Sequence, residues 1–301
     1  MKKNLDYKIA SPGTSLMILL LTFVVCLVMA GILVTLLGKI IHRPEAAGRI
    51  LAVVQDLFIF IIPAFVAGFT ASRLPARMLG VDRKPDWTFM LISLLVLMVS
   101  VPAMNMLIGL NQSIHLPASM ASTEQWMRNM EDAAAEATSV ILGGQTVGAL
   151  IVSVLIVGVL AGFSEELFFR GALQRILMAT RLPAWSVIWI VALIFSAFHF
   201  QFFGFLPRLL LGAYFGYLLY WSRCLWVPVC VHIFNNSVYV ISRWCAGENS
   251  NNSSGIDTFG SNLSDPLEIT AVCVSIVLTI AGILWLKSLA CKNDNLPAVG
   301  Q

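Results

Sequence analysis

The sequence predicts an all-α, polytopic membrane protein, built as one bundle of about eight transmembrane helices. Of the 301 residues, 58% are hydrophobic and only 12% are charged, whereas soluble domains are about 45–50% apolar and about 25% charged. The mean hydropathy of +0.84 agrees with this contrast. Apolar runs close to the ~20 residues that a spanning helix needs recur along the chain. The length therefore suits one membrane bundle better than two soluble domains.

This pattern divides the chain into three parts. Residues 1–144 hold three predicted helices and a long extracytoplasmic loop, residues 145–245 hold four, and residues 246–301 hold a loop, the last helix and a short cytoplasmic tail. A surface helix is predicted over 120–137, and a loop over the Asn-, Ser- and Gly-rich stretch 247–265. Helices five to seven are short and closely spaced, so one of them is alternatively a re-entrant element. The apolar segments are 14–38, 48–72, 87–110, 146–178, 185–203, 206–222, 226–243 and 267–287.

Basic residues set the predicted orientation, because cytoplasmic loops carry an excess of Lys and Arg. With both termini in the cytoplasm, 13 of the 19 basic residues lie on or near that side. We expect an integral protein of a bacterial cytoplasmic membrane that contacts the lipid bilayer. The net charge of +3 includes no block of like charge, so nucleic acid is not an expected partner. The 13 residues are Lys2, Lys3, Lys8, Arg73, Arg77, Arg83, Lys84, Arg170, Arg175, Arg181, Arg223, Lys287 and Lys292.

Charged side chains interrupt the fourth apolar segment. The stretch Ser164-Glu165-Glu166-Leu167-Phe168-Phe169-Arg170 carries two adjacent carboxylates and an arginine. Each charge inside a membrane costs from about 2.5 to well over 10 kcal/mol, and such a residue is by default a functional candidate. Glu166 and Arg170 are four residues apart and face each other on a helix. Glu165 is rotated by about 100° from Glu166 and is left free to face the interior of the bundle.

Two later segments carry histidines at helical spacing. Phe195 and His199 are four residues apart on the fifth segment, and His232 and Asn236 are four apart on the seventh, so each pair shares a helix face. At 1.5 Å per residue, counts from the expected cytoplasmic edges place Glu165, His199 and Asn236 all about 15 Å deep. A single ion pair or histidine is often only structural. Three such features at one depth favour a catalytic site.

Together these patterns resemble the motifs of the type II CAAX prenyl endopeptidase family, also called the CAAX-protease and bacteriocin-processing (abortive-infection) family of intramembrane proteases. Glu165-Glu166-x-x-x-Arg170, Phe195-x-x-x-His199 and His232-x-x-x-Asn236 match in order, spacing and placement on apolar helices. The resemblance covers residues 145–245 and no earlier part of the chain. It implies eight helices, a site open to the cytoplasmic side, and hydrolysis of peptide or protein substrates at the membrane. Prenylated CAAX tails and bacteriocin-like leader peptides are the known kinds of substrate.

Hydrolysis of an amide requires an activated water, donors for the oxyanion and an acid for the leaving amine. We assign Glu165 as the general base, with His199 helping to hold the water and with His232 and Asn236 donating to the oxyanion. Glu166 and Arg170 hold the helix face in register, or Arg170 binds a substrate carboxylate. The six candidate catalytic residues are Glu165, Glu166, Arg170, His199, His232 and Asn236.

The resemblance leaves the cofactor open, because the family is commonly classed as metallopeptidases while its metal is disputed. Two histidines and a carboxylate are a usual catalytic set for Zn²⁺, and Glu165, His199 and His232 supply one. The chain lacks H-E-x-x-H, so spacing gives no direct support. A metal-free mechanism, in which Glu165 activates the water, is the alternative.

Two other functions stay open. One is a non-catalytic membrane scaffold or immunity protein of the same fold, because intact motifs do not prove turnover. The other is an ion-coupled transporter. Transporters are usually built from repeated halves, and the polar cluster has no counterpart before residue 140, which disfavours that reading. The sequence makes no prediction about oligomeric state.

Overall fold

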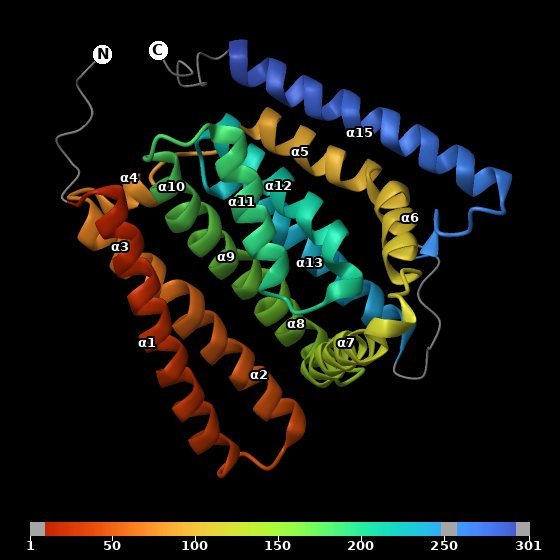
Figure 1. Cartoon of the computed structure of the whole chain (residues 1–301), viewed down its shortest axis with the longest axis horizontal. Helices are drawn as coiled ribbons and strands as arrows, with labels where there is room; N and C mark the ends of the chain where they lie inside the picture. Colours follow the sequence, from red (N-terminus) through yellow and green to blue (C-terminus); the bar gives the residue numbers. More distant parts are fainter. Residues whose placement is uncertain (1–9, 248–257, 293–301) are drawn as a thin grey trace.

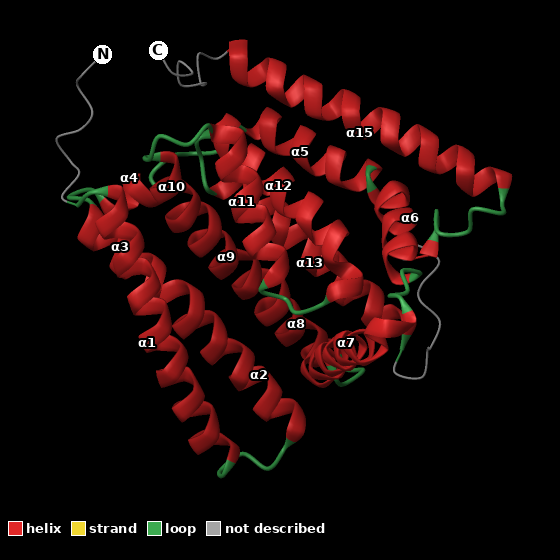
Figure 2. Cartoon of the chain, in the orientation of Figure 1, coloured by secondary structure: helices red, strands yellow, loops and turns green. Residues whose placement is uncertain are grey.

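The computed structural model describes residues 10–247 and 258–292. The regular structure of these residues is helical, without a strand (Figure 2). This confirms the all-α bundle. Lys2, Lys3, Lys8, most of the loop predicted over 247–265 and the end of the cytoplasmic tail lie outside the described residues.

The chain starts with a helical hairpin at one edge of the bundle (Figure 1). Helix α1 (Pro12–Gly38) begins where the Ser11 hydroxyl accepts a hydrogen bond from the Thr14 N–H and Pro12 fixes the first turn. The return helix, Pro44–Ala71, is continuous. It consists of α2 (Pro44–Gln55), a π-helical stretch η1 (Asp56–Ile61) and α3 (Ile62–Ala71). The short α4 (Pro75–Leu79) follows and ends at Gly80, whose φ of 79° favours glycine.

The third predicted span, over 87–110, is broken. Helices α5 (Trp87–Val99) and α6 (Val101–Gln112) meet at an angle of 46°. Pro102, in the first turn of α6, has no N–H to donate and clashes with the preceding turn, which accounts for the bend. The last helix, α15 (Pro266–Lys292), packs against both parts.

The predicted surface helix is α7 (Ala121–Leu142), which runs five residues beyond its expected end and has no buried residue. It follows the 3-10 turn η2 (Ala118–Met120) and lies across one end of the bundle (Figure 1). Glu124 in its first turn accepts hydrogen bonds from Arg128 and from the Leu116 N–H. Hydrogen bonds from Arg128, Leu116 and His115 lower the pKa of the Glu124 carboxyl to about 2.

One long helix, Val147–Met178, carries the first motif. Two of its stretches are π-helical, and such distortions recur at functional sites. Helix α13 (Trp226–Ala246) packs closely along it. A Cβ at Gly162 would lie 3.1 Å from the Ile233 backbone nitrogen, so glycine permits this approach. The parts of the long helix are α8 (Val147–Ser153), η3 (Val154–Leu160), α9 (Ala161–Glu166), η4 (Leu167–Gln174) and α10 (Arg175–Met178).

The fifth predicted span is shorter than expected. Helix α11 (Ala184–Ala197) has 14 residues, or about 21 Å, against a hydrocarbon core of about 30 Å. The chain then leaves the helix, and Phe200 takes a φ of 52°. It resumes in a 3-10 turn, η5 (Phe202–Gly204), and in α12 (Phe205–Ser222). The expectation of a helix over 185–203 is therefore wrong at its end.

The expected count of eight spans is not confirmed. Five helices in the described residues are long and apolar enough to cross a membrane, or six if α5 and α6 form one bent span. The other two predicted spans correspond to α11, which is short, and α13. Helix α13 is long enough but carries polar side chains, among them His232, Asn235 and Asn236.

Candidate active site

Three segments that are distant in the sequence bring the motifs together. They are the middle of the long helix at Glu165 and Glu166, the turn after α11 at His199, and α13 at His232. Helix α9 packs against α13, and α11 packs against η4, which follows α9 in the same long helix (Figure 1). Five of the six candidates form one connected cluster, and Asn236 lies one helical turn beyond it.

Arg170 and Glu166 form an ion pair sealed from solvent. The Arg170 Nη1 and Glu166 Oε1 atoms are 2.8 Å apart, and both side chains are 0% exposed. Arg170 Nη2 donates to the Gly212 carbonyl at 2.9 Å, and its guanidinium lies 4.5 Å from the centre of the Phe195 ring. An arginine enclosed in this way is not accessible to substrate. The geometry therefore favours the register role of the pair over capture of a substrate carboxylate by Arg170.

Glu166 also fixes His232. The His232 Nδ1 and Glu166 Oε1 atoms are 2.9 Å apart. Because Glu166 is paired with Arg170 and accepts, His232 Nδ1 is the donor and its Nε2 is left with a lone pair when the ring is neutral. The Phe215 ring stacks on the imidazole with 4.7 Å between ring centres. His232 is thus held on one edge and one face, with Nε2 directed towards Glu165.

His199 has the same tautomer for a different reason. Its Nδ1 lies 2.9 Å from the Phe195 carbonyl oxygen, which can only accept. Nδ1 therefore donates, and Nε2 of the neutral ring is an acceptor. That Nε2 lies 4.0 Å from Glu165 Oε2, and His232 Nε2 lies 3.9 Å from the same oxygen.

Three acceptors from three segments therefore surround one small space. Glu165 Oε2 is buried and has no hydrogen-bond partner among the described residues. Its distances to the two imidazoles exceed the range of a direct hydrogen bond, about 2.7–3.2 Å, and suit one bridging water. The side chains of His199, Glu165 and His232 are 29%, 14% and 5% exposed, so access is from the His199 side.

The comparison with known families covers the part of the chain that carries these residues. Residues 147–238 match the model of the Rce1-like family, described as type II CAAX prenyl endopeptidase Rce1-like. This confirms the resemblance over that part of the chain, which we call the Rce1-like region and which contains all six candidate residues. No curated protein and no solved structure matches the chain.

Asn236, the last residue of the Rce1-like motifs, does not face the three acceptors. Its Nδ2 donates to the Val157 carbonyl at 3.2 Å, and its Oδ1 lies 3.3 Å from Asn235 Nδ2. Val157 belongs to the π-helical stretch η3, where the regular ladder of backbone hydrogen bonds is disturbed. Donation from Asn236 to an oxyanion would require its amide to leave this carbonyl.

The three expected metal ligands have the right chemistry for zinc, since each presents an acceptor atom to the same space. Their spacing does not fit as placed. Two ligands at about 2.0–2.1 Å from a tetrahedral zinc lie about 3.3 Å apart, whereas both imidazoles are 3.9–4.0 Å from Glu165. In the described part of the chain, no three His, Cys, Asp or Glu side chains are placed to hold a metal ion. Zinc stays a prediction.

Sequence reasoning missed Asp56, which lies outside the Rce1-like region. It begins the π-helical stretch η1, is 5% exposed, and accepts a hydrogen bond of 3.0 Å from the Ser164 hydroxyl. Ser164 immediately precedes Glu165. The signal was present, because a carboxylate inside the apolar run 48–72 is itself a functional candidate.

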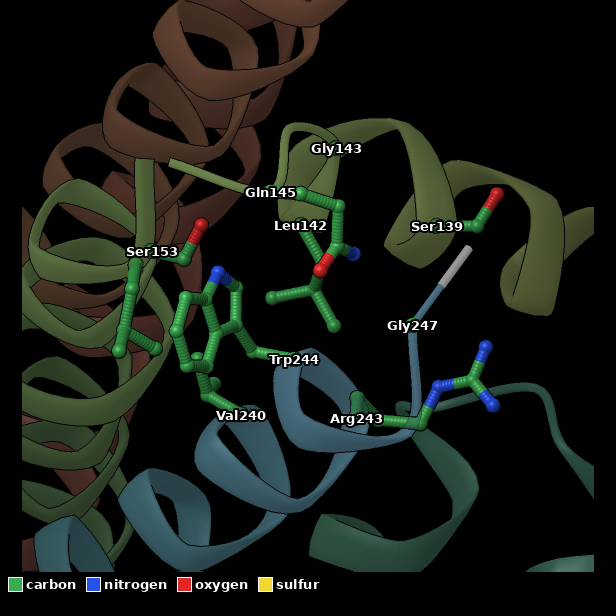
Figure 3. A pocket seen from close by; sticks show the side chains of 10 residues that line it. Ser139, Leu142, Gly143, Gln145, Ser153, Val240, Arg243, Trp244 and Gly247 are labelled. Atoms are coloured by element: carbon green, nitrogen blue, oxygen red, sulfur yellow. The ribbon is translucent and has the colours of Figure 1, made fainter. Parts of the chain in front are cut away.

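A pocket of about 240 Å³ lies elsewhere, between the end of α7, the start of α8 and the end of α13 (Figure 3). Val240, in its wall, is eight residues beyond His232, or about 12 Å along the helix. Next to the site, Gly162 of α9 packs closely against Ile233 of α13, so the two helices are in contact there. The pocket is therefore not the candidate active site. Its lining is Ser139, Leu142, Gly143, Gln145, Leu150, Ser153, Val240, Arg243, Trp244 and Gly247.

Proposed function

We propose that the chain is an intramembrane endopeptidase that hydrolyses peptide bonds of membrane-associated substrates, such as prenylated CAAX tails or leader peptides. The Rce1-like match suggests intramembrane CAAX protease activity. The observation that carries the proposal is the convergence of Glu165 Oε2 with Nε2 of His199 and of His232. The proposed setting is a bacterial cytoplasmic membrane.

Glu165 is the general base in this mechanism and Glu166 is not. Glu166 Oε1 is already paired with Arg170 and with His232. Glu166 Oε2 has no hydrogen-bond partner in the part of the chain that the structure describes, but the side chain is 0% exposed and closed off from substrate. Glu165 has an oxygen without a partner that faces the proposed water. Glu165 takes one proton of the water, and His199 Nε2 accepts a hydrogen bond from the O–H that remains. The water oxygen then attacks the carbonyl carbon of the substrate.

Collapse of the tetrahedral intermediate then breaks the C–N bond. The proton held by Glu165 passes to the leaving amine nitrogen, so the products are a carboxylic acid and an amine. His232 would donate from Nε2 to the oxyanion after taking up a proton from solvent before the reaction, and the Glu166 carboxylate beside Nδ1 would offset the charge of that imidazolium. Asn236 would add a second donor after releasing the Val157 carbonyl.

The test compares the wild type with Glu165→Gln in the native membrane. Mass spectrometry of membrane peptides should find new N-termini that depend on the wild-type protein and disappear with Glu165→Gln. Purified protein in lipid nanodiscs, given a farnesylated CAAX peptide, tests one substrate class directly. Undiminished cleavage by folded Glu165→Gln would remove the proposed base. Binding of peptides without any cleavage by the wild type would favour the non-catalytic scaffold. Metal analysis of the active preparation decides the zinc question separately.

A further inference from the structure

The turn that carries His199 is a stretch of irregular backbone between two apolar helices. We call residues 198–204 the His199 turn; it joins α11 to α12. Helix α11 is about 21 Å long, which is less than the thickness of a bilayer core, about 30 Å. A helix of this length that starts at one face of the core ends, and the turn begins, before the other face. Non-helical backbone at such depth is tolerated only where protein groups or a polar space satisfy its N–H and C=O groups. Phe200, at φ 52°, adds a strained residue that its surroundings must hold in place.

Asn111 of α6 satisfies two of these backbone groups. Its Nδ2 donates to the Phe202 carbonyl at 3.2 Å, and its Oδ1 accepts from the Leu206 N–H at 3.0 Å. The residue is 4% exposed. Both arms of the amide are therefore used to join the end of the His199 turn to the start of α12.

Glu131 of α7 satisfies a third group. Its Oε2 accepts from the Phe203 N–H at 2.8 Å. Two further α7 side chains pack on the same place: the Arg128 guanidinium lies 4.2 Å from the centre of the Phe203 ring, and the rings of Trp126 and Phe202 are 5.3 Å apart. Helix α7 is thereby fastened to the His199 turn.

The Rce1-like region supplies further hydrogen bonds itself. The Ser196 hydroxyl donates to the Phe205 carbonyl at 2.7 Å, and Arg208 Nη1 donates to the Gln201 carbonyl at 3.4 Å. From outside this region, α6 and α7 hold the turn by hydrogen bonds, and the Phe23 ring of α1 lies 5.6 Å from the Phe198 ring.

We infer that Asn111 and Glu131, which lie outside the Rce1-like region, are positioning residues that set the place of His199 relative to Glu165. Neither touches the proposed water. Both act through the backbone of the His199 turn, and losing either would let the imidazole move from its 4.0 Å distance to Glu165. Residues before position 147 would therefore influence the geometry of the active site. The catalytic consequence rests on the proposed function, whereas the geometry of the turn does not.

The chain offers matched controls for both residues. Asn105 is also a buried asparagine of α6, 8% exposed, but it donates to the Phe259 carbonyl, away from His199. Asp132 follows Glu131 on α7 and is exposed. Glu131→Gln keeps an acceptor for the Phe203 N–H and is the conservative variant, whereas Glu131→Ala removes the acceptor.

The first measurement needs no activity. The chain has four histidines, so ¹⁵N-imidazole NMR of full-length protein in nanodiscs can resolve the His199 signal, assigned through His199→Gln. We expect Asn111→Ala and Glu131→Ala to shift or broaden it, and Asn105→Ala, Asp132→Asn and Glu131→Gln to leave it unchanged. Hydrogen exchange over 198–206 should rise with the same two variants. An unchanged His199 signal in Asn111→Ala and Glu131→Ala would overturn the inference.

The second measurement is kcat and KM on a cleaved substrate. A displaced catalytic group costs on the order of 10- to 100-fold in rate, so kcat should fall by that factor in Asn111→Ala and Glu131→Ala while KM changes little. Wild-type kcat in variants with a displaced His199 signal would refute the positioning role. A wild type without peptidase activity would refute the proposed function instead, and the NMR result would still decide whether these residues hold His199.

Discussion

His232 Nδ1 and Glu166 Oε1, on helices α13 and α9, lie 2.9 Å apart and join the two halves of the candidate site. The same carboxylate oxygen pairs with Arg170. One buried oxygen therefore orients the histidine and neutralises the arginine. This arrangement separates the adjacent glutamates into a structural residue, Glu166, and a residue free for chemistry, Glu165.

That separation predicts opposite effects for two neighbouring substitutions. Glu166→Gln leaves the buried Arg170 cation without its partner, which typically costs about 3–5 kcal/mol, so the melting temperature in detergent should fall clearly. Glu165→Gln removes a carboxylate that has no ion-pair partner within hydrogen-bond distance, so the fold should persist while cleavage is lost. Thermal unfolding of both variants beside the wild type measures the difference. Equal stability of the two variants would contradict the assignment.

Asp56 leads to a prediction about stability. In the described residues, no Lys or Arg forms an ion pair with it, and its contact is the Ser164 hydroxyl. Asp56→Asn keeps an acceptor oxygen and removes a buried charge, so we expect unchanged or higher thermal stability. Ser164→Ala should cost about 1.5–3 kcal/mol while Asp56 is charged, and less in the Asp56→Asn background. A double-mutant cycle measures this coupling, and a coupling of zero would show that the hydrogen bond contributes nothing.

Helical spacing in the sequence predicted much of the site, but it did not predict the residues that hold the His199 turn in place. The four-residue interval was enough to pair Glu166 with Arg170, because both lie on one continuous helix. The end of α11 was hidden, since four phenylalanines follow within 198–203 and the residue with positive φ is Phe200 rather than glycine. Asn111 and Glu131 were missed because their partners are 91 and 72 residues away. Such contacts depend on tertiary packing, which one sequence does not contain.

Glu124 predicts how α7 responds to acid. Hydrogen bonds from Arg128, Leu116 and His115 lower its pKa to about 2, from 4.5 in an unfolded chain. A carboxyl with a lowered folded-state pKa contributes stability that is fully present above pH 4.5 and is lost as the pH falls towards 2. Hydrogen exchange at the start of α7 should therefore increase, after correction for intrinsic rates, from pH 5 to about pH 2.5. Glu124→Gln should abolish most of this pH dependence, and a wild-type response in that variant would exclude Glu124 as the cause.

Orientation is the point on which two expectations conflict. The distribution of basic residues places the N-terminus in the cytoplasm, whereas the family resemblance implies a site open to the cytoplasmic side. In the structure, α1 begins at the end of the bundle opposite α7 (Figure 1), and α7 is bonded to the His199 turn, the side from which the site is accessible. Both expectations therefore cannot hold together if substrate enters past His199.

Cysteine labelling in intact cells decides between them. Trp126 on α7 is 50% exposed. Lys84 is exposed in the loop before α5, and α5 starts at the opposite end of the bundle from α7 (Figure 1). In a background without other exposed cysteines, we expect a membrane-impermeant maleimide to label Trp126→Cys from outside, and Lys84→Cys only after permeabilisation, because the positive-inside rule places the more basic end in the cytoplasm. The reverse labelling would overturn the N-in orientation and place the His199 side of the site in the cytoplasm, where a prenylated tail would reach it.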